Sequence, residues 1–118
     1  MAKILIIDDD RPFCNLLKKQ VRAMGHEAGA AHTLADARKL VTAGGYDVVY
    51  LDVRMPDGNG LELLPDLRTS GSSPEVIIIT GQGDPAGAEL AIQYDAWDYI
   101  QKGDTFDTIV RPDRENMQ

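Results

Sequence analysis

The sequence lacks several features that mark secreted, membrane-bound or nucleic-acid-binding proteins. Its one cysteine, Cys14, excludes an internal disulfide and predicts a reducing, cytoplasmic setting. No apolar run is long enough to cross a membrane, and the residues after Met1 lack the pattern of a signal peptide. Positive charge is also scarce, since the formal net charge is −7 at pH 7. We therefore expect no direct binding to nucleic acid by this domain.

The composition that remains is that of an ordinary globular domain. The chain has 118 residues, of which 43% are hydrophobic and 26% charged, and this suffices for one hydrophobic core. The sequence contains no internal repeat, no low-complexity segment and no sign of a second domain. We expect one domain over residues 1–111 and a polar tail or linker over residues 112–118.

Apolar runs alternate with segments of helical periodicity along the chain. Five runs predict strands, and the second, weakest one is expected at a sheet edge; they cover residues 3–7, 26–31, 46–52, 75–80 and 97–101. The segments between them predict helices, and a short last helix is expected at residues 105–111. This alternation implies right-handed crossovers and a parallel sheet with helices on both faces.

Proline and capping residues indicate where the helices begin. Pro12 is expected in the first turn of the first helix, beside a half-buried Cys14 thiol. Thr33 is predicted to cap the second helix. Pro65 lies near the start of the third and is expected to remove one backbone hydrogen bond there. The turn residues of 53–60 predict an irregular loop.

Four of the five predicted strands end in polar residues at the same edge of the sheet. These residues are Asp8 with Asp9, Asp52, Thr80 and Lys102. Parallel sheets bind ligands beyond the carboxyl ends of their strands. Three carboxylates crowded there repel one another, which lowers stability unless a cation lies among them. Oxygen ligands favour a hard ion such as Mg²⁺. His26 and His32 are not placed to join these ligands, so a zinc site is not expected.

An ammonium and a hydroxyl beside a metal-bound carboxylate form an environment for phosphoryl transfer. In such a site the cation and Lys102 would neutralise the phosphoryl oxygens, and a carboxylate would act as the nucleophile. Asp52 is the best candidate for this acceptor because it stands alone on the middle strand. Asp8 and Asp9 form a pair suited to holding the cation.

Four short motifs together resemble those of bacterial two-component response regulator receiver domains. In chain order they are Ile6–Asp10, Leu51–Gly58, Ile79–Gly81 and Asp98–Lys102, and the resemblance covers roughly residues 3 to 110. It implies an α/β, flavodoxin-like fold, a doubly wound five-stranded parallel sheet of order 2-1-3-4-5. The segments around residues 84–92 and 96–99 are most similar to receivers attached to enhancer-binding transcription activators.

The resemblance implies a role for each acidic residue of the motifs. Asp52 would accept a phosphoryl group from a sensor histidine kinase or a phosphotransfer protein. Asp9, Asp52 and the backbone carbonyl of Arg54 would ligate Mg²⁺ directly, and Asp8 would act through water. The domain would not be an enzyme beyond catalysing its own phosphorylation and dephosphorylation.

The resemblance also implies a switch. Thr80 and Lys102 would contact the phosphoryl group, and Tyr99 would be an aromatic switch coupled to Thr80. The repacked surface would control a partner or output domain. A homodimer through the fourth helix and fifth strand is expected because the short last helix leaves apolar area near the fifth strand uncovered. Two positions depart from the family, since Gly103 replaces its usual proline and Asp95 replaces a usual glycine.

Three other interpretations remain open at this point. An aspartyl-phosphate hydrolase of the haloacid dehalogenase type also places acids after its first strand, but here Arg11–Pro12 follows and little room is left for a substrate cap. A phosphorylation-independent interaction module would keep the fold without the chemistry. The strand-end residues could also form a salt-bridge cluster, with Thr80 bonding the backbone and Tyr99 a half-buried strand residue.

Overall fold

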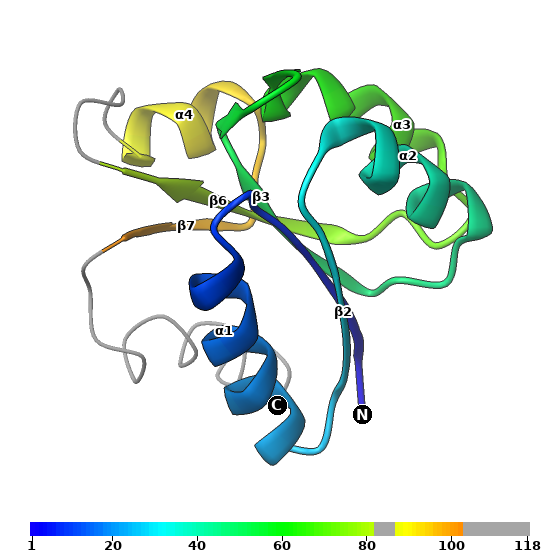
Figure 1. Ribbon diagram of the computed structural model, residues 1–118. Helices are drawn as coiled ribbons and strands as arrows, with labels where there is room; N and C mark the ends of the chain where they lie inside the picture. Colours follow the sequence, from blue (N-terminus) through cyan, green and yellow to red (C-terminus); the bar gives the residue numbers. More distant parts are fainter. Residues whose placement is uncertain (82–86, 103–118) are drawn as a thin grey trace.

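The sheet has the order expected from the resemblance. The computed structural model describes residues 1–81 and 87–102 (Figure 1). Within them, five parallel strands lie in the order β2-β1-β3-β6-β7. Their bounds are Lys3–Ile7 (β1), Glu27–Ala31 (β2), Val48–Asp52 (β3), Glu75–Thr80 (β6) and Asp98–Gln101 (β7). The weak second strand lies at the edge, as predicted.

Helices cover both faces of this sheet, which confirms the doubly wound α/β prediction. Helix α1 lies against one face, and α2, α3 and α4 lie against the other (Figure 1). Their bounds are Arg11–Ala23 (α1), Leu34–Ala43 (α2), Leu64–Thr69 (α3) and Gly87–Gln93 (α4). No described helix has the length and apolar character needed to cross a membrane. The predicted helix at residues 105–111 and Gly103 lie outside the described residues.

The three central strands are buried on both faces, which explains their unbroken apolar sequences. Alternate residues point to opposite faces of a strand, so each of these strands contributes to two cores. One core joins Leu5, Val49 and Ile78 to α2, α3 and α4. The other joins Ile4, Ile6, Tyr50 and Ile77 to α1. These two cores hold the strand ends in fixed positions.

The predicted cap at Thr33 and the predicted first-turn proline at Pro12 are present, and Asp10 is a further cap. Asp10 caps α1 by accepting a hydrogen bond from the Phe13 amide at 3.1 Å, and Pro12 lies in the first turn. The Thr33 hydroxyl accepts from the Asp36 amide at 3.1 Å and caps α2. Pro65 falls in the first turn of α3, where amides have no helical partner, so the predicted loss of a hydrogen bond does not arise in that helix.

The segment after Asp52 is more ordered than the sequence predicts. It forms a short antiparallel hairpin of β4 (Arg54–Met55) and β5 (Gly58–Asn59), followed by the 3₁₀ turn η1 (Gly60–Leu63). The Gly60 amide donates to the Val53 carbonyl at 2.7 Å. A Cβ atom at Gly60 would overlap the Asp52 carbonyl oxygen, so only glycine lets this turn close directly over the strand end.

Candidate phosphoryl-acceptor site

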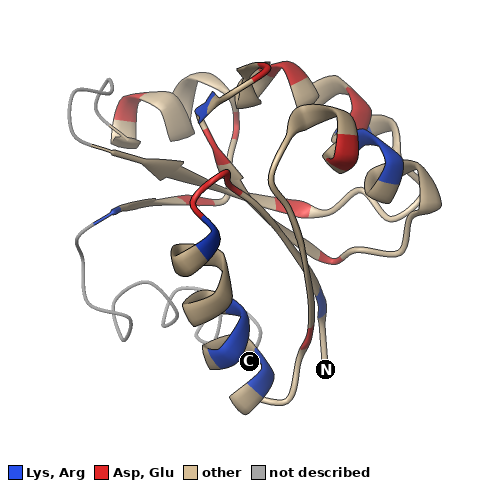
Figure 2. Cartoon of the chain, viewed as in Figure 1, with Lys and Arg blue, Asp and Glu red and all other residues tan. Residues whose placement is uncertain are grey.

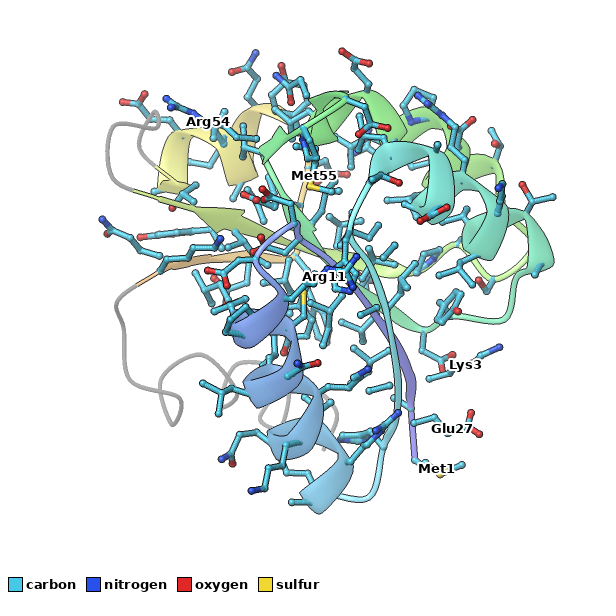
Figure 3. All side chains as sticks on the ribbon, viewed as in Figure 1. Met1, Lys3, Arg11, Glu27, Arg54 and Met55 are labelled. Atoms are coloured by element: carbon cyan, nitrogen blue, oxygen red, sulfur yellow. The ribbon has the colours of Figure 1, made fainter. Side chains whose placement is uncertain are left out.

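The polar strand ends meet at one edge of the sheet, as the sequence predicts. Asp8 follows β1, Asp52 ends β3, Thr80 ends β6 and Lys102 follows β7. Figure 2 shows the acidic segment that joins β1 to α1 beside the acidic end of β3. The labelled Arg54 lies at this end of the molecule, opposite Met1, Lys3 and Glu27 (Figure 3).

Three carboxylates converge at this edge. One oxygen each from Asp8, Asp9 and Asp52 lies within 4.8 Å of the other two. The Asp8 residue is 0% exposed and Asp52 is 5% exposed, whereas Asp9 is open to solvent. A set of oxygen atoms at this spacing could hold one small hard cation.

The Lys102 ammonium lies among these carboxylates but closest to Asp8. Its Nζ is 3.0 and 2.9 Å from the two Asp8 oxygens, 3.8 Å from Asp10 Oδ2 and 4.0 Å from Asp52 Oδ2. Burial lowers the pKa of Lys102, but the hydrogen bond and charge of Asp8, followed by the charges of Asp52 and Asp10, outweigh it and raise that pKa. The ammonium thus stays charged and is shared unequally. Its main partner is Asp8 rather than Asp52.

Of the two buried acids, Asp52 is the less compensated. Burial, followed by the negative charge of Asp8, raises its pKa to about 7, and the Lys102 ammonium offsets only part of this rise. The Arg54 amide donates to Asp52 Oδ1 over a long 3.5 Å, and this bond opposes the shift. Without a cation, ionising Asp52 near neutral pH therefore works against its surroundings.

Thr80 ends β6, the strand beside β3, whereas Tyr99 lies on β7, one strand further from Asp52. Thr80 follows Ile79, the residue paired with Asp52, and is 3% exposed. Its hydroxyl donates to the Ile100 carbonyl at 3.3 Å. Tyr99 is 40% exposed, and its ring covers the start of α4 so closely that a Cβ atom at Gly87 would overlap it.

His32 lies beside the site without joining the three carboxylates, as predicted, whereas the prediction of a half-buried Cys14 was wrong. His32 Nδ1 lies 2.9 Å from the Asp8 carbonyl oxygen, so His32 borders the site. The Cys14 thiol is fully buried rather than half-buried and donates to the same oxygen at 3.3 Å. Burial, helped by the charges of Asp8 and Asp10, raises the pKa of Cys14 to about 12 and makes the thiol unreactive. The strand register was the missing information, because β2 pairs residue by residue with β1.

Comparison with known proteins decides the family. The sequence model of the response regulator receiver domain family matches residues 4–111 of this chain. The chain belongs to this family. This receiver domain is 31% identical over 99 residues to the photosynthetic apparatus regulatory protein RegA of Rhodovulum sulfidophilum. The aligned segment covers 84% of this chain and 54% of RegA. It is 36% identical over 102 residues to the transcriptional regulatory protein CpxR of Escherichia coli K12. That aligned segment covers 86% of this chain and 43% of CpxR.

Solved structures agree with the fold of this receiver domain. The crystal structure of a response regulator receiver domain protein from Methanospirillum hungatei has a TM-score of 0.87 at 22% identity. The match covers 99% of this chain and 94% of that chain. The receiver domain spans about half the length of the two curated relatives above. The resemblance to enhancer-binding activators stays a prediction.

The raised pKa of Asp52 predicts how stability depends on pH in EDTA. The folded state keeps the Asp52 proton up to about pH 7, whereas the unfolded chain releases it near pH 4. The contribution of Asp52 to the free energy of unfolding therefore falls as the pH rises between those values. Asp52→Asn removes the effect. The variant should therefore be more stable than the parent above about pH 8, and its advantage should shrink toward about pH 4.

Urea unfolding in EDTA at several pH values measures this difference. Asp36→Asn, which neutralises an exposed acid in α2, is the control and should show no such trend. A salt-bridge cluster predicts the reverse, because removing one member of a satisfied network lowers stability. An Asp52→Asn variant that is less stable than the parent at alkaline pH would support that alternative.

Proposed function

We propose that this receiver domain accepts a phosphoryl group on Asp52 from a sensor histidine kinase or a phosphotransfer protein in a two-component pathway. The observation that carries the proposal is the setting of Asp52. It is a buried acid at the tip of a central strand, with an ammonium at 4.0 Å and two further carboxylates beside it. Membership of the family supports the same role.

We further propose Mg²⁺ as the cation of this site. Three carboxylate oxygens within 4.8 Å of one another, without a nitrogen or sulfur donor among them, suit a hard ion. Asp9 and Asp52 would ligate it directly together with the Arg54 carbonyl, and Asp8 would act through water. When bound, Mg²⁺ supplies positive charge that neutralises phosphoryl oxygens.

The chain's own residues account for the rest of the transfer. An ionised Asp52 oxygen attacks phosphorus, a P–O bond forms, and the P–N bond to the donor imidazole breaks with its electrons on nitrogen. Lys102 would turn from Asp8 toward the new phosphoryl oxygens. Each domain accepts one group and loses it again by hydrolysis, so it acts as a phosphoacceptor rather than as an enzyme that turns over a small substrate.

The first test is chemical labelling. Incubation with acetyl phosphate or phosphoramidate and Mg²⁺ should add one phosphoryl group per chain, and hydroxylamine should release it because it is an acyl phosphate. EDTA should prevent the reaction. Intact-protein mass spectrometry follows the added mass.

Asp52→Asn should abolish the labelling, while the control Asp36→Asn should leave it unchanged. Equal labelling of Asp52→Asn and the parent would show that the acceptor is assigned wrongly. No labelling of the parent would favour the phosphorylation-independent interaction module. Steady turnover of a small phosphate ester would favour the hydrolase.

We propose that phosphorylation repacks the surface formed by α4 and β7. The Thr80 hydroxyl would leave the Ile100 carbonyl for the phosphoryl oxygens, and Tyr99 would move into the space it vacates. The phosphoryl group can shift the equilibrium between the unswitched and the repacked surface only by the difference in its affinity for the two. The exposed Ile92, at 83%, and Tyr99 would make this surface the site of a homodimer or of a partner contact.

Beryllofluoride, which stands in for the phosphoryl group on Asp52, tests this switch. With Mg²⁺ it should change amide chemical shifts from Thr80 to Lys102, and most strongly after Ile100, whose carbonyl loses the hydroxyl. Thr80→Val keeps the side-chain shape without the hydroxyl and should lose most of the response in β7.

Changes confined to the loop after Asp52 would contradict the coupling between Thr80 and Tyr99. Light scattering of the same samples tests self-association separately. A monomer at high concentration both with and without beryllofluoride would exclude the homodimer. We also propose that the output under the control of this surface is transcription regulation, the role in the name of the relative CpxR.

A further inference from the structure

The turn between β2 and α2, residues 32–35, supplies no group to the proposed chemistry, yet it contacts both acidic loops of the site. At one end, His32 bonds the main chain of Asp8. At the other end, two backbone amides bond the side chain of Asp57, in the loop that follows Asp52. In Figure 1 this turn is the cyan segment that leads from β2 into α2. It links the two strand ends that carry the buried carboxylates.

The turn and its neighbours hold both main-chain groups of Asp8. The Asp8 amide donates to the Ala31 carbonyl at 3.0 Å. The Asp8 carbonyl accepts from His32 Nδ1 at 2.9 Å and from the Cys14 thiol at 3.3 Å. Because a carbonyl oxygen can only accept, the His32 proton that makes this bond must be on Nδ1. The end of β1 is therefore tied to the end of β2 and to α1.

The loop after Asp52 is tied to the same turn through a carboxylate. Asp57 Oδ1 accepts from the Leu34 amide at 2.8 Å, and Oδ2 accepts from the Ala35 amide at 3.1 Å. The Leu34 bond is the main reason that the pKa of Asp57 lies below its ordinary value. Asp57 thus satisfies two amides of the first turn of α2, which have no partner within the helix.

We propose that the turn at residues 32–35 is a positioning element that sets the separation of the Asp8 and Asp52 carboxylates for the cation. The proposal rests on the Mg²⁺ site proposed above. Oxygens from the two strand ends now lie within 4.8 Å, which suits a single ion. Losing the bond at either end of the turn would let one loop shift, and the ligands would remain present but spread apart.

Two matched pairs of variants test this by calorimetric titration with Mg²⁺. His32→Asn keeps an N–H donor near the position of Nδ1, and His32→Leu has a similar shape without it. Asp57→Asn keeps one acceptor oxygen, and Asp57→Ala keeps none, while both carry the same charge. We expect His32→Leu and Asp57→Ala to bind Mg²⁺ about tenfold more weakly than their Asn counterparts.

A purely structural role would lower the melting temperature of these variants without changing their Mg²⁺ affinity well below it. Equal affinities within each pair would therefore overturn the proposal while leaving the Mg²⁺ site intact. A parent protein that does not bind Mg²⁺ would overturn both.

Nitrogen-15 NMR of His32 in the parent gives an answer even if the variants fail to fold. With the ring neutral, its proton is expected on Nδ1. A proton on Nε2 would be incompatible with the bond to Asp8 and would overturn the proposal.

Discussion

Three carboxylates and one ammonium share the carboxyl edge of the sheet, and this imbalance of charge is the constraint on which the site depends. Lys102 pairs with Asp8 at 2.9–3.0 Å, and Asp52 is left at 4.0 Å. Because Asp52 is also buried, its charge is less compensated than that of Asp8, and its pKa rises to about 7. The same lack of compensation suits the cation binding and the phosphoryl acceptance that we propose for this site.

The fold sustains this arrangement by separating it from the cores that stabilise the domain. Three central strands bury apolar side chains on both faces, and the polar residues begin only where these strands end. Burial of apolar surface stabilises the strands and thereby offsets the electrostatic cost at their tips. Gly60 and the turn at residues 32–35 then limit how far the two acidic loops can move. The acidic side chains at the strand ends therefore stay close together despite their mutual repulsion.

The sequence predicted those parts of the structure that depend on local patterns. Unbroken apolar runs located β1, β3 and β6, and Thr33 and Pro12 located helix starts, because these signals lie within a few residues. The strand order came from the resemblance to receiver domains, which the structure confirms. The hairpin of β4 and β5 was missed because two-residue strands are too short to show a period of two.

Contacts between distant segments were harder to predict. The sequence placed Asp8, Asp52 and Lys102 at one edge, but it did not rank the two acids as partners of the ammonium, since that depends on burial and side-chain reach. The contact of His32 with the main chain of Asp8 was missed because it follows from the register of β1 with β2. No pattern within one segment specifies such a register.

A carbon-13 NMR titration of the Asp52 carboxyl group in the metal-free protein tests this charge imbalance most directly. We predict a midpoint at about pH 7, because burial and the charge of Asp8 together outweigh the attraction of Lys102. A midpoint at about pH 4, the ordinary value for aspartate, would contradict it. Such a result would mean that Lys102 or another group already compensates Asp52 and that the metal-free site has no need of a cation.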